Sequence, residues 1–244
     1  MSSRRVLIVG LGAMGTSIGL ALRERDWHVL YIDKRELADT RGAHERGNFD
    51  DPVDLTIIAT PEDEALRVLP QTRGLVTSVC SLMGPLRRAA TGDFVAGHPM
   101  AGTEKSGPEG ASEKMFAGQF WFVDRDQPIV REMIETCGAT QKEIDVDEHD
   151  LGVALGSHLP QLLSTALAAH MHDNPDALRF SATGLKTFLR LAGSGAEMWK
   201  PLIADNKQNI APHAEAVAQI VRDMLEKDPT AIFKAANEVY DSLK

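Results

Sequence analysis

The most distinctive chemistry in this 244-residue sequence lies in the stretch VAGHPMAGTEKSG, residues 95–107. His98 stands there between Gly97 and Pro99, where an expected strand over residues 94–96 runs out into a loop. A packing histidine usually sits among apolar neighbours, whereas a polar side chain on a loop after a strand is well placed to act on a ligand. Imidazole gains and loses a proton near pH 7, so His98 is a candidate general base.

A second group of residues predicts a dinucleotide site. The stretch VLIVGLGAMG places Gly10, Gly12 and Gly15 between an apolar run and a helical pattern, with Met14 inside the loop. The first glycine permits a tight turn, the second lets the backbone approach a pyrophosphate, and the third allows close packing of helix on strand. The anion then faces the N-terminus of the helix. The alternative is a strand-to-helix turn that binds nothing.

The next apolar run ends in an acidic residue, Asp33, about twenty residues beyond the glycines, as this fingerprint expects. Its carboxylate can accept hydrogen bonds from ribose hydroxyls and repel a 2′-phosphate, which favours NAD over NADP. Lys34 and Arg35 follow and are able to bind that phosphate, so NADP stays open. Thr60 and Pro61 end another run and are further candidates for cofactor contact, unless the proline merely ends a strand.

The remaining candidates are polar or aromatic residues spread along the chain. Each also has a structural interpretation: His158 as the neighbour of a helix start, Arg190 as a surface cation, and Trp199 as a core aromatic. Because a dinucleotide fold does not specify a substrate, function depends on whether these residues come together with His98 and Glu104.

Alternating short apolar runs and helix-like stretches in the first half predict parallel strands joined by crossovers. The expected strands cover residues 6–9, 29–32, 55–59, 75–79, 94–96 and 121–123, and residues 34–53 are expected to form a clipped helix or a loop. Helical periodicity takes over after residue 147. The sequence therefore predicts an α/β fold in which a Rossmann domain, residues 1–147, precedes an all-helical domain, residues 148–244. About a hundred helical residues bury little core alone, so we expect the second domain to form a homodimer.

Composition excludes several classes of protein. With 43% hydrophobic residues and a net charge of -9, the chain is an ordinary globular protein without the dense basic cluster that nucleic-acid binding needs. No apolar run is long enough to cross a membrane. The N-terminal residues lack the pattern of a signal peptide, which predicts a cytoplasmic protein. Cys80 and Cys137 are expected to be reduced thiols, and no metal-ligand spacing involves them.

Three motifs together resemble the prephenate and arogenate dehydrogenases of tyrosine biosynthesis. They are GHPMAGTEKSG, SHLPQLLSTALA from Ser157, and LKTFLRLAGSGAEMWKPLIADNKQNI from Leu185, with the acidic lead-in Glu148-His149-Asp150 before the second domain. The match runs in one order along nearly the whole chain. The resemblance implies a Rossmann domain joined to a helical dimerisation domain, and NAD-dependent oxidative decarboxylation of prephenate to 4-hydroxyphenylpyruvate.

The resemblance also implies roles for individual residues. His98 accepts a hydrogen bond from the C4 hydroxyl of the ring and takes its proton, and Ser81 holds the hydroxyl and the histidine in position. Arg190 binds a substrate carboxylate, for which a planar two-pronged donor is suited. The resemblance assigns His158 and Trp199 to the lining of the same pocket and Glu104 to a gating or ionic-network position.

Several alternatives stay open. Gln161 stands where many relatives have a further histidine, which bears on how the substrate side chain is treated. Arogenate, or a ring with a 4-amino group (4-amino-4-deoxyprephenate), could replace prephenate. The β-hydroxyacid dehydrogenases share the opening GLGAMG, but their glycine-rich helix with a catalytic lysine is missing from this sequence. A dinucleotide-binding sensor without catalysis would not need His98, His158, Ser81 and Arg190 together.

Overall fold

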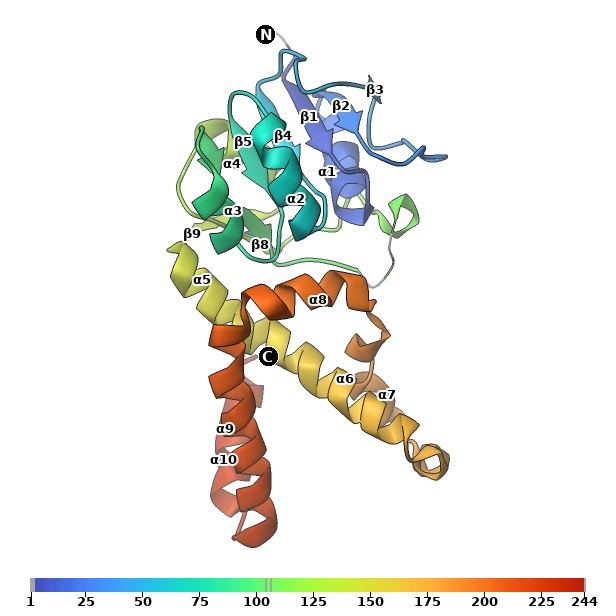
Figure 1. The fold of residues 1–244 in the computed structure, drawn as a ribbon, viewed down its shortest axis with the longest axis vertical. Helices are drawn as coiled ribbons and strands as arrows, with labels where there is room; N and C mark the ends of the chain where they lie inside the picture. The colour runs from blue at the N-terminus through green and yellow to red at the C-terminus, as the bar shows by residue number, and fades with distance from the viewer. Residues whose placement is uncertain (1–2, 104, 106, 244) are drawn as a thin grey trace.

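The computed structural model describes residues 3–103, 105 and 107–243, which form an α/β half followed by a helical half (Figure 1). Six strands make the main sheet in the order β3-β2-β1-β4-β5-β6, and every strand pair in it is parallel. This is the strand order of a dinucleotide-binding Rossmann domain, so the predicted fold class is confirmed. The strands are β1 (Arg5–Val9), β2 (His28–Ile32), β3 (Glu45–Arg46), β4 (Leu55–Ile58), β5 (Val76–Ser78) and β6 (Phe94–Val95).

The central strand β1 shows why the apolar runs become buried strands. Val6 and Ile8 point into one hydrophobic cluster, whereas Leu7 and Val9 point into the other, on the opposite face of the sheet. A parallel sheet covered on both faces needs apolar side chains at every position, not at alternate ones. The helices of this half are α1 (Ala13–Arg23), α2 (Glu62–Val68), α3 (Gly84–Ala89) and α4 (Pro128–Thr136), with short 3₁₀ turns at Leu69–Gln71 and Pro108–Gly110.

Three further strands form a separate small sheet, and here the predictions were partly wrong. Strand β7 (Gly97–Pro99) pairs antiparallel with β8 (Phe120–Val123), which pairs parallel with β9 (Thr140–Glu143). His98 was expected on a loop but lies in the middle of β7. The strand expected at residues 121–123 exists, but it belongs to this second sheet. The segment 34–53 contains no helix and contributes the two-residue strand β3.

The helical half begins with one long run of helix. Helix α5 (Val146–Val153) continues through a π-helical turn, η3 (Ala154–His158), into α6 (Leu159–His172). The predicted domain boundary, between residues 147 and 148, falls in the first turn of α5. The later elements are the 3₁₀ turns at Pro175–Phe180 and Leu191–Gly193 and the helices α7 (Thr183–Phe188), α8 (Ala196–Asp205), α9 (Lys207–Glu226) and α10 (Thr230–Ser242). In Figure 1, α6 with α7 and α9 with α10 extend as two arms away from the sheet, and α8 lies between the arms and the α/β half.

Candidate active site

The glycine loop has the geometry that a dinucleotide requires. Gly10 has a φ of 98°, and a Cβ atom there would lie 2.8 Å from the carbonyl oxygen of Ala59. A Cβ at Gly15 would lie 2.0 Å from the carbonyl oxygen of Gly10, so helix α1 packs on the loop without room for a side chain. A Cβ at Gly12 would meet no atom within 4 Å, which leaves its backbone open toward solvent at the start of α1. The two outer glycines serve packing, and the middle one leaves space for an anion.

The carboxylate of Asp33 is not free. Its Oδ2 accepts hydrogen bonds from the backbone N–H of Leu11 at 3.0 Å and from Nη2 of Arg35 at 3.0 Å. Its Oδ1 accepts from the backbone N–H of Arg35 at 2.9 Å and from Nε of Arg35 at 3.0 Å. Burial works to raise the pKa of Asp33, but the hydrogen bonds from Arg35 and Leu11 outweigh it and lower the pKa overall. A carboxylate has about four acceptor positions, so a ribose hydroxyl must displace part of the half-exposed Arg35 side chain.

Strand β7 brings His98 to the carboxyl end of the main sheet. Its first residue, Gly97, packs so closely on β5 that a Cβ would lie 2.8 Å from the carbonyl oxygen of Ser78. The end of β4 is next along this edge, where the Oγ1 of Thr60 is buried without a hydrogen-bond partner among the described residues. Open α/β sheets bind ligands at this edge. His98 and the glycine loop therefore lie at the same edge of the sheet, the carboxyl edge.

His98 is joined to two buried polar residues of α5. Its Nδ1 lies 3.0 Å from Nε2 of His149, and Nδ1 of His149 lies 2.9 Å from Oδ1 of Asp150. His149 and Asp150 are 2% and 7% exposed, whereas His98 keeps part of its ring accessible. Burial, with the neighbouring His149 and His158, lowers the pKa of His98 to about 3, so the ring is neutral at pH 7.

The π-helical turn between α5 and α6 places His158 beside this group. Pro160 has no N–H for a helical hydrogen bond, and a widened turn is one way in which a helix tolerates a proline. His158 is 1% exposed, and burial lowers its pKa. Its Nδ1 lies 3.2 Å from Nδ2 of Asn206, and the same amide donates to the carbonyl oxygen of Asp150 at 2.8 Å. Since Nδ1 faces the Asn206 donor, neutral His158 has its proton on Nε2.

Of the other predicted substrate residues that the structure describes, it is Trp199 that contacts this group of histidines directly. The Trp199 ring meets the His158 ring edge-on at 5.7 Å, and its Nε1 is buried without a partner among the described residues. Ser81 is half-buried in the segment between β5 and α3. Arg190 is exposed directly before the 3₁₀ turn at Leu191–Gly193, and no hydrogen bond or ion pair among the described residues joins it to His98. Glu104 lies outside the described residues.

Gln161 supports the segment that carries Arg190. Its amide donates to the carbonyl oxygen of Leu191 at 2.8 Å, and Ser164, one turn later, donates to the carbonyl oxygen of Phe188 at 2.8 Å. Both α6 residues are buried, at 4% and 1% exposure. Gln161 thus holds the backbone around Arg190.

Sequence reasoning gave no separate role to His149, Asp150 or Asn206. All three occur within the stretches that carry the family resemblance. The signal that marks them is a polar residue within four positions of the apolar residues Val153, Leu202 and Ile210, which become buried.

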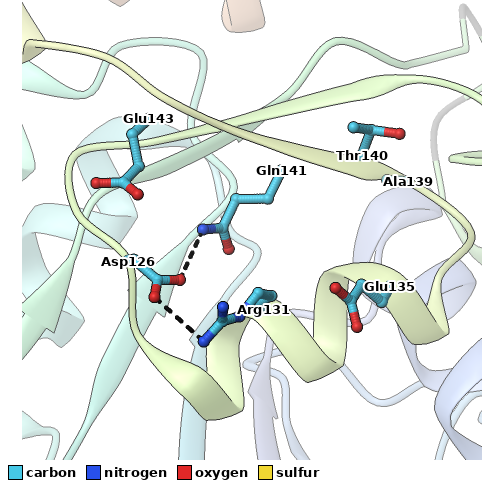
Figure 2. A pocket seen from close by; sticks show the side chains of 7 residues that line it. All are labelled: Asp126, Arg131, Glu135, Ala139, Thr140, Gln141 and Glu143. Carbon is cyan, nitrogen blue, oxygen red and sulfur yellow. Dashed lines mark hydrogen bonds and ion pairs between the residues drawn. The ribbon is translucent and has the colours of Figure 1, made fainter.

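A pocket of about 360 Å³ lies elsewhere, against α4 and β9 (Figure 2). Arg131 there is already paired with Asp126 at 3.1 Å, and Gln141 donates to the same carboxylate at 2.9 Å. Glu135 and Glu143 add further negative charge, which does not suit an anionic ligand. None of its lining residues belongs to the His98 cluster. Within the part of the chain that the structure describes, no group of three or more metal-ligating side chains is arranged to hold an ion.

Known proteins share this architecture. Residues 19–140 match the family model for the nucleotide-binding domain of prephenate dehydrogenase, and residues 145–231 match the model for its dimerization domain. The chain belongs to the prephenate dehydrogenase family. In the described residues, no helix is both long and apolar enough to cross a membrane.

Individual members of the family are similar over most of the chain. The prephenate dehydrogenase of Bacillus subtilis (strain 168) is 28% identical over 98% of this chain and 76% of its own length. A Streptomyces niveus protein described as probable prephenate dehydrogenase NovF is 29% identical over 91% of this chain and 68% of its own length. The crystal structure of Aquifex aeolicus prephenate dehydrogenase with hydroxyphenyl propionate and NAD+ superposes with a TM-score of 0.82. It is 24% identical and covers 100% of this chain and 96% of that one.

Proposed function

We propose that the protein catalyses the NAD-dependent oxidative decarboxylation of prephenate to 4-hydroxyphenylpyruvate, a step of tyrosine biosynthesis. The observation that carries the proposal is the position of His98, which lies at the carboxyl edge of the Rossmann sheet. The same edge carries the dinucleotide loop, and His158 is near enough to influence the charge of His98. Membership of the prephenate dehydrogenase family and the similarity to curated prephenate dehydrogenases support the choice of reaction.

The residues at the edge of the sheet fit NAD. Gly10, Gly12 and Gly15 shape the loop, and Gly12 opens toward the place of the pyrophosphate. We assign the adenosine ribose to Asp33. Met14, Thr60 and Pro61 complete the proposed cofactor site, and the buried, unpartnered Thr60 hydroxyl is a polar group that a ligand would satisfy. When bound, the nicotinamide ring accepts the hydride that leaves C4 of the substrate.

His98 handles the one proton that the reaction moves. As hydride leaves C4, the C4 hydroxyl becomes a protonated carbonyl, which is strongly acidic, so a neutral imidazole of low pKa suffices to accept the proton. The bond to the ring carboxyl group then breaks, carbon dioxide leaves, and its electron pair enters the ring. The ring becomes aromatic, and His98 returns the proton to the phenolic oxygen. Because aromatisation drives the step, the protein mainly has to position the reactants.

We assign the substrate's polar groups to four further side chains. Ser81 holds the C4 hydroxyl, and Arg190 binds a carboxylate. His158 can donate from Nε2, and Trp199 from its buried, unpartnered Nε1. Glu104 stays a proposed gating residue, on the family resemblance alone.

The substitution His98→Asn tests the assignment. It keeps a polar side chain but removes the proton acceptor, so kcat should fall by roughly 100-fold or more while the KM for prephenate changes little. The readout is NADH formation in steady-state kinetics. Near-normal kcat in this variant would exclude His98 as the base.

We also propose a homodimer formed by the helical half. No described residue after Ile210 is buried, although this region contains most of α9 and all of α10. Large apolar side chains are exposed on both arms, including Phe180, Phe188, Leu225, Phe233 and Val239. An apolar surface of this kind marks an interaction site, and a dimerization-domain family model matches residues 145–231. Sedimentation as a monomer at micromolar concentration would contradict the dimer.

A further inference from the structure

We propose that His149 and Asp150 are positioning residues that hold His98 in the tautomer with its proton on Nδ1 and its lone pair on Nε2. Only that tautomer directs a proton acceptor away from the buried histidine pair and toward the accessible side of the ring. The proposal deepens the function proposed above and rests on it, since it concerns how His98 becomes a competent base.

The Asp150 carboxylate meets hydrogen-bond donors on several sides. Its Oδ1 accepts from the backbone N–H of Met83 at 3.0 Å, and its Oδ2 accepts from the backbone N–H of Gly84 at 2.9 Å. An ionised carboxylate can only accept hydrogen bonds. The remaining contact, from Nδ1 of His149 to Oδ1 at 2.9 Å, therefore requires a proton on that nitrogen.

The proton on Nδ1 decides the rest of the chain of contacts. Neutral His149 with its proton on Nδ1 has a lone pair on Nε2. Nδ1 of His98 lies 3.0 Å from that lone pair, so it must be the donor. Neutral His98 is then left with its acceptor on Nε2. The two rings stand at 88° to each other, and the ring of Phe122 contacts His149 edge-on at 5.7 Å, which restricts rotation of the middle ring.

Hydrogen bonds from neighbouring segments of the site also hold Asp150 in place. Met83 and Gly84 directly follow Leu82 and the proposed substrate residue Ser81, so Asp150 ties that segment to α5. Asn206 joins the backbone of Asp150 to the ring of His158. Burying two polar side chains is unfavourable unless their hydrogen bonds are satisfied. When His98 takes a proton on Nε2, the positive charge on its ring faces the Asp150 carboxylate through His149.

Two substitutions at His149 separate positioning from packing. His149→Leu keeps the volume roughly but removes the acceptor, whereas the side-chain oxygen of His149→Gln can reach the place of Nε2 and accept from His98. We expect His149→Leu to lower kcat at least about tenfold with a small change in KM, and His149→Gln to recover most of that loss. If His149 had only a packing role, His149→Leu and His149→Gln would not differ in kcat while their KM values stayed the same.

The control is the second His-Asp neighbour pair of the chain. Nδ1 of His172 lies 3.3 Å from Oδ1 of Asp173, but both side chains are exposed at the end of α6. His172→Leu should leave kcat and the state of His98 unchanged.

A measurement without substrate tests the tautomer directly. In protein labelled with ¹⁵N-histidine, the chain has eight histidines, and the signals of His98 are those lost in His98→Asn. We expect the proton of His98 on Nδ1 in the unmutated protein and a shift toward Nε2 in His149→Leu. A proton on Nε2 of His98 in the unmutated protein would overturn the proposal, and so would His149→Gln that is no more active than His149→Leu.

The two proposals fail in distinguishable ways. If the purified protein does not oxidise prephenate, the proposed function fails, whereas the ¹⁵N spectra still decide the tautomer. If prephenate is oxidised but His98 has its proton on Nε2, the positioning proposal alone fails. If His149→Leu does not fold, the ¹⁵N spectrum of the unmutated protein still shows which nitrogen of His98 has the proton, and so still tests the positioning proposal.

Discussion

Glu62, the first residue of α2, should make the protein less stable as the pH rises. Its side chain is buried, and neither carboxyl oxygen has a hydrogen-bond partner among the described residues. Burial, with the nearby carboxylates of Asp205 and Asp150, raises the pKa of Glu62 from 4.5 to about 8, although Arg88 opposes the shift. The folded protein thus keeps a proton there that the unfolded chain loses above pH 4.5.

The size of the effect follows from the linkage between proton binding and folding. Between pH 4.5 and about 8 the unfolded state binds one proton fewer at this site, so the free energy of unfolding falls by about 1.4 kcal/mol per pH unit. At pH 7 the loss is at most about 3.5 kcal/mol, and it levels off above pH 8. Glu62→Gln keeps the shape of the protonated acid and cannot ionise. It should therefore match the unmutated protein near pH 5 and exceed it increasingly toward pH 8.

The assay is urea unfolding at pH 5, 6, 7 and 8, followed by tryptophan fluorescence. One fixed protein concentration is used, since the stability of the proposed dimer would depend on concentration. Glu64→Gln on the same helix is the matched control, because Glu64 is paired with Lys34 and Arg67. That change should be slightly destabilising and should not give a gain that grows with pH. A stability difference between Glu62→Gln and the unmutated protein that stays constant from pH 5 to pH 8 would refute the reasoning.

Three further predictions concern the substrate, the cofactor and the dimer. Arg190→Gln should raise the KM for prephenate roughly tenfold or more with a small effect on kcat, because the proposed contact with the substrate carboxylate would be present throughout the reaction; an unchanged KM excludes the contact. Arg35→Ala should lower the KM for NAD about threefold or more, since it frees two acceptor positions of Asp33 that side-chain hydrogen bonds now fill. Lys34→Ala is its control, and equal effects of the two changes would show that only surface charge matters. Leu225→Asp, at a side chain 84% exposed on α9, should weaken the proposed homodimer in sedimentation velocity, and an unaltered dimer would place the interface elsewhere.

The main sheet could be predicted because its strands are buried on both faces. Residues 6–9 are apolar at every position, which indicates a central parallel strand without reference to the rest of the chain. The small sheet gave no such signal. Strand β9 has the sequence TQKE and is mostly exposed, so its pairing with β8 sets its conformation. Strand β7 ends in Pro99, which a strand tolerates at the edge of a sheet, and β7 is an edge strand.

The candidate site was predictable in its residue types but not in its connections. His98 and His158 stand in recognisable motifs, and the glycines and Asp33 follow a known spacing. The contact between His98 and His149 spans 51 positions, and that between Asp150 and the N–H of Gly84 spans 66. No local pattern reports such contacts, because they arise only when α5 packs against β7 and the start of α3. The hydrogen bonds from the Arg35 side chain to the Asp33 carboxylate could not be predicted either, because charged residues close in sequence need not bind each other.

The most direct test of the proposed function is an absorbance assay at about 340 nm, the band of reduced nicotinamide, with the purified protein. Prephenate and arogenate are each combined with NAD and with NADP, and the product is identified by mass. We predict NADH formation with prephenate and NAD, matched mole for mole by 4-hydroxyphenylpyruvate and carbon dioxide. No reduction of either cofactor with either substrate would contradict the proposed function.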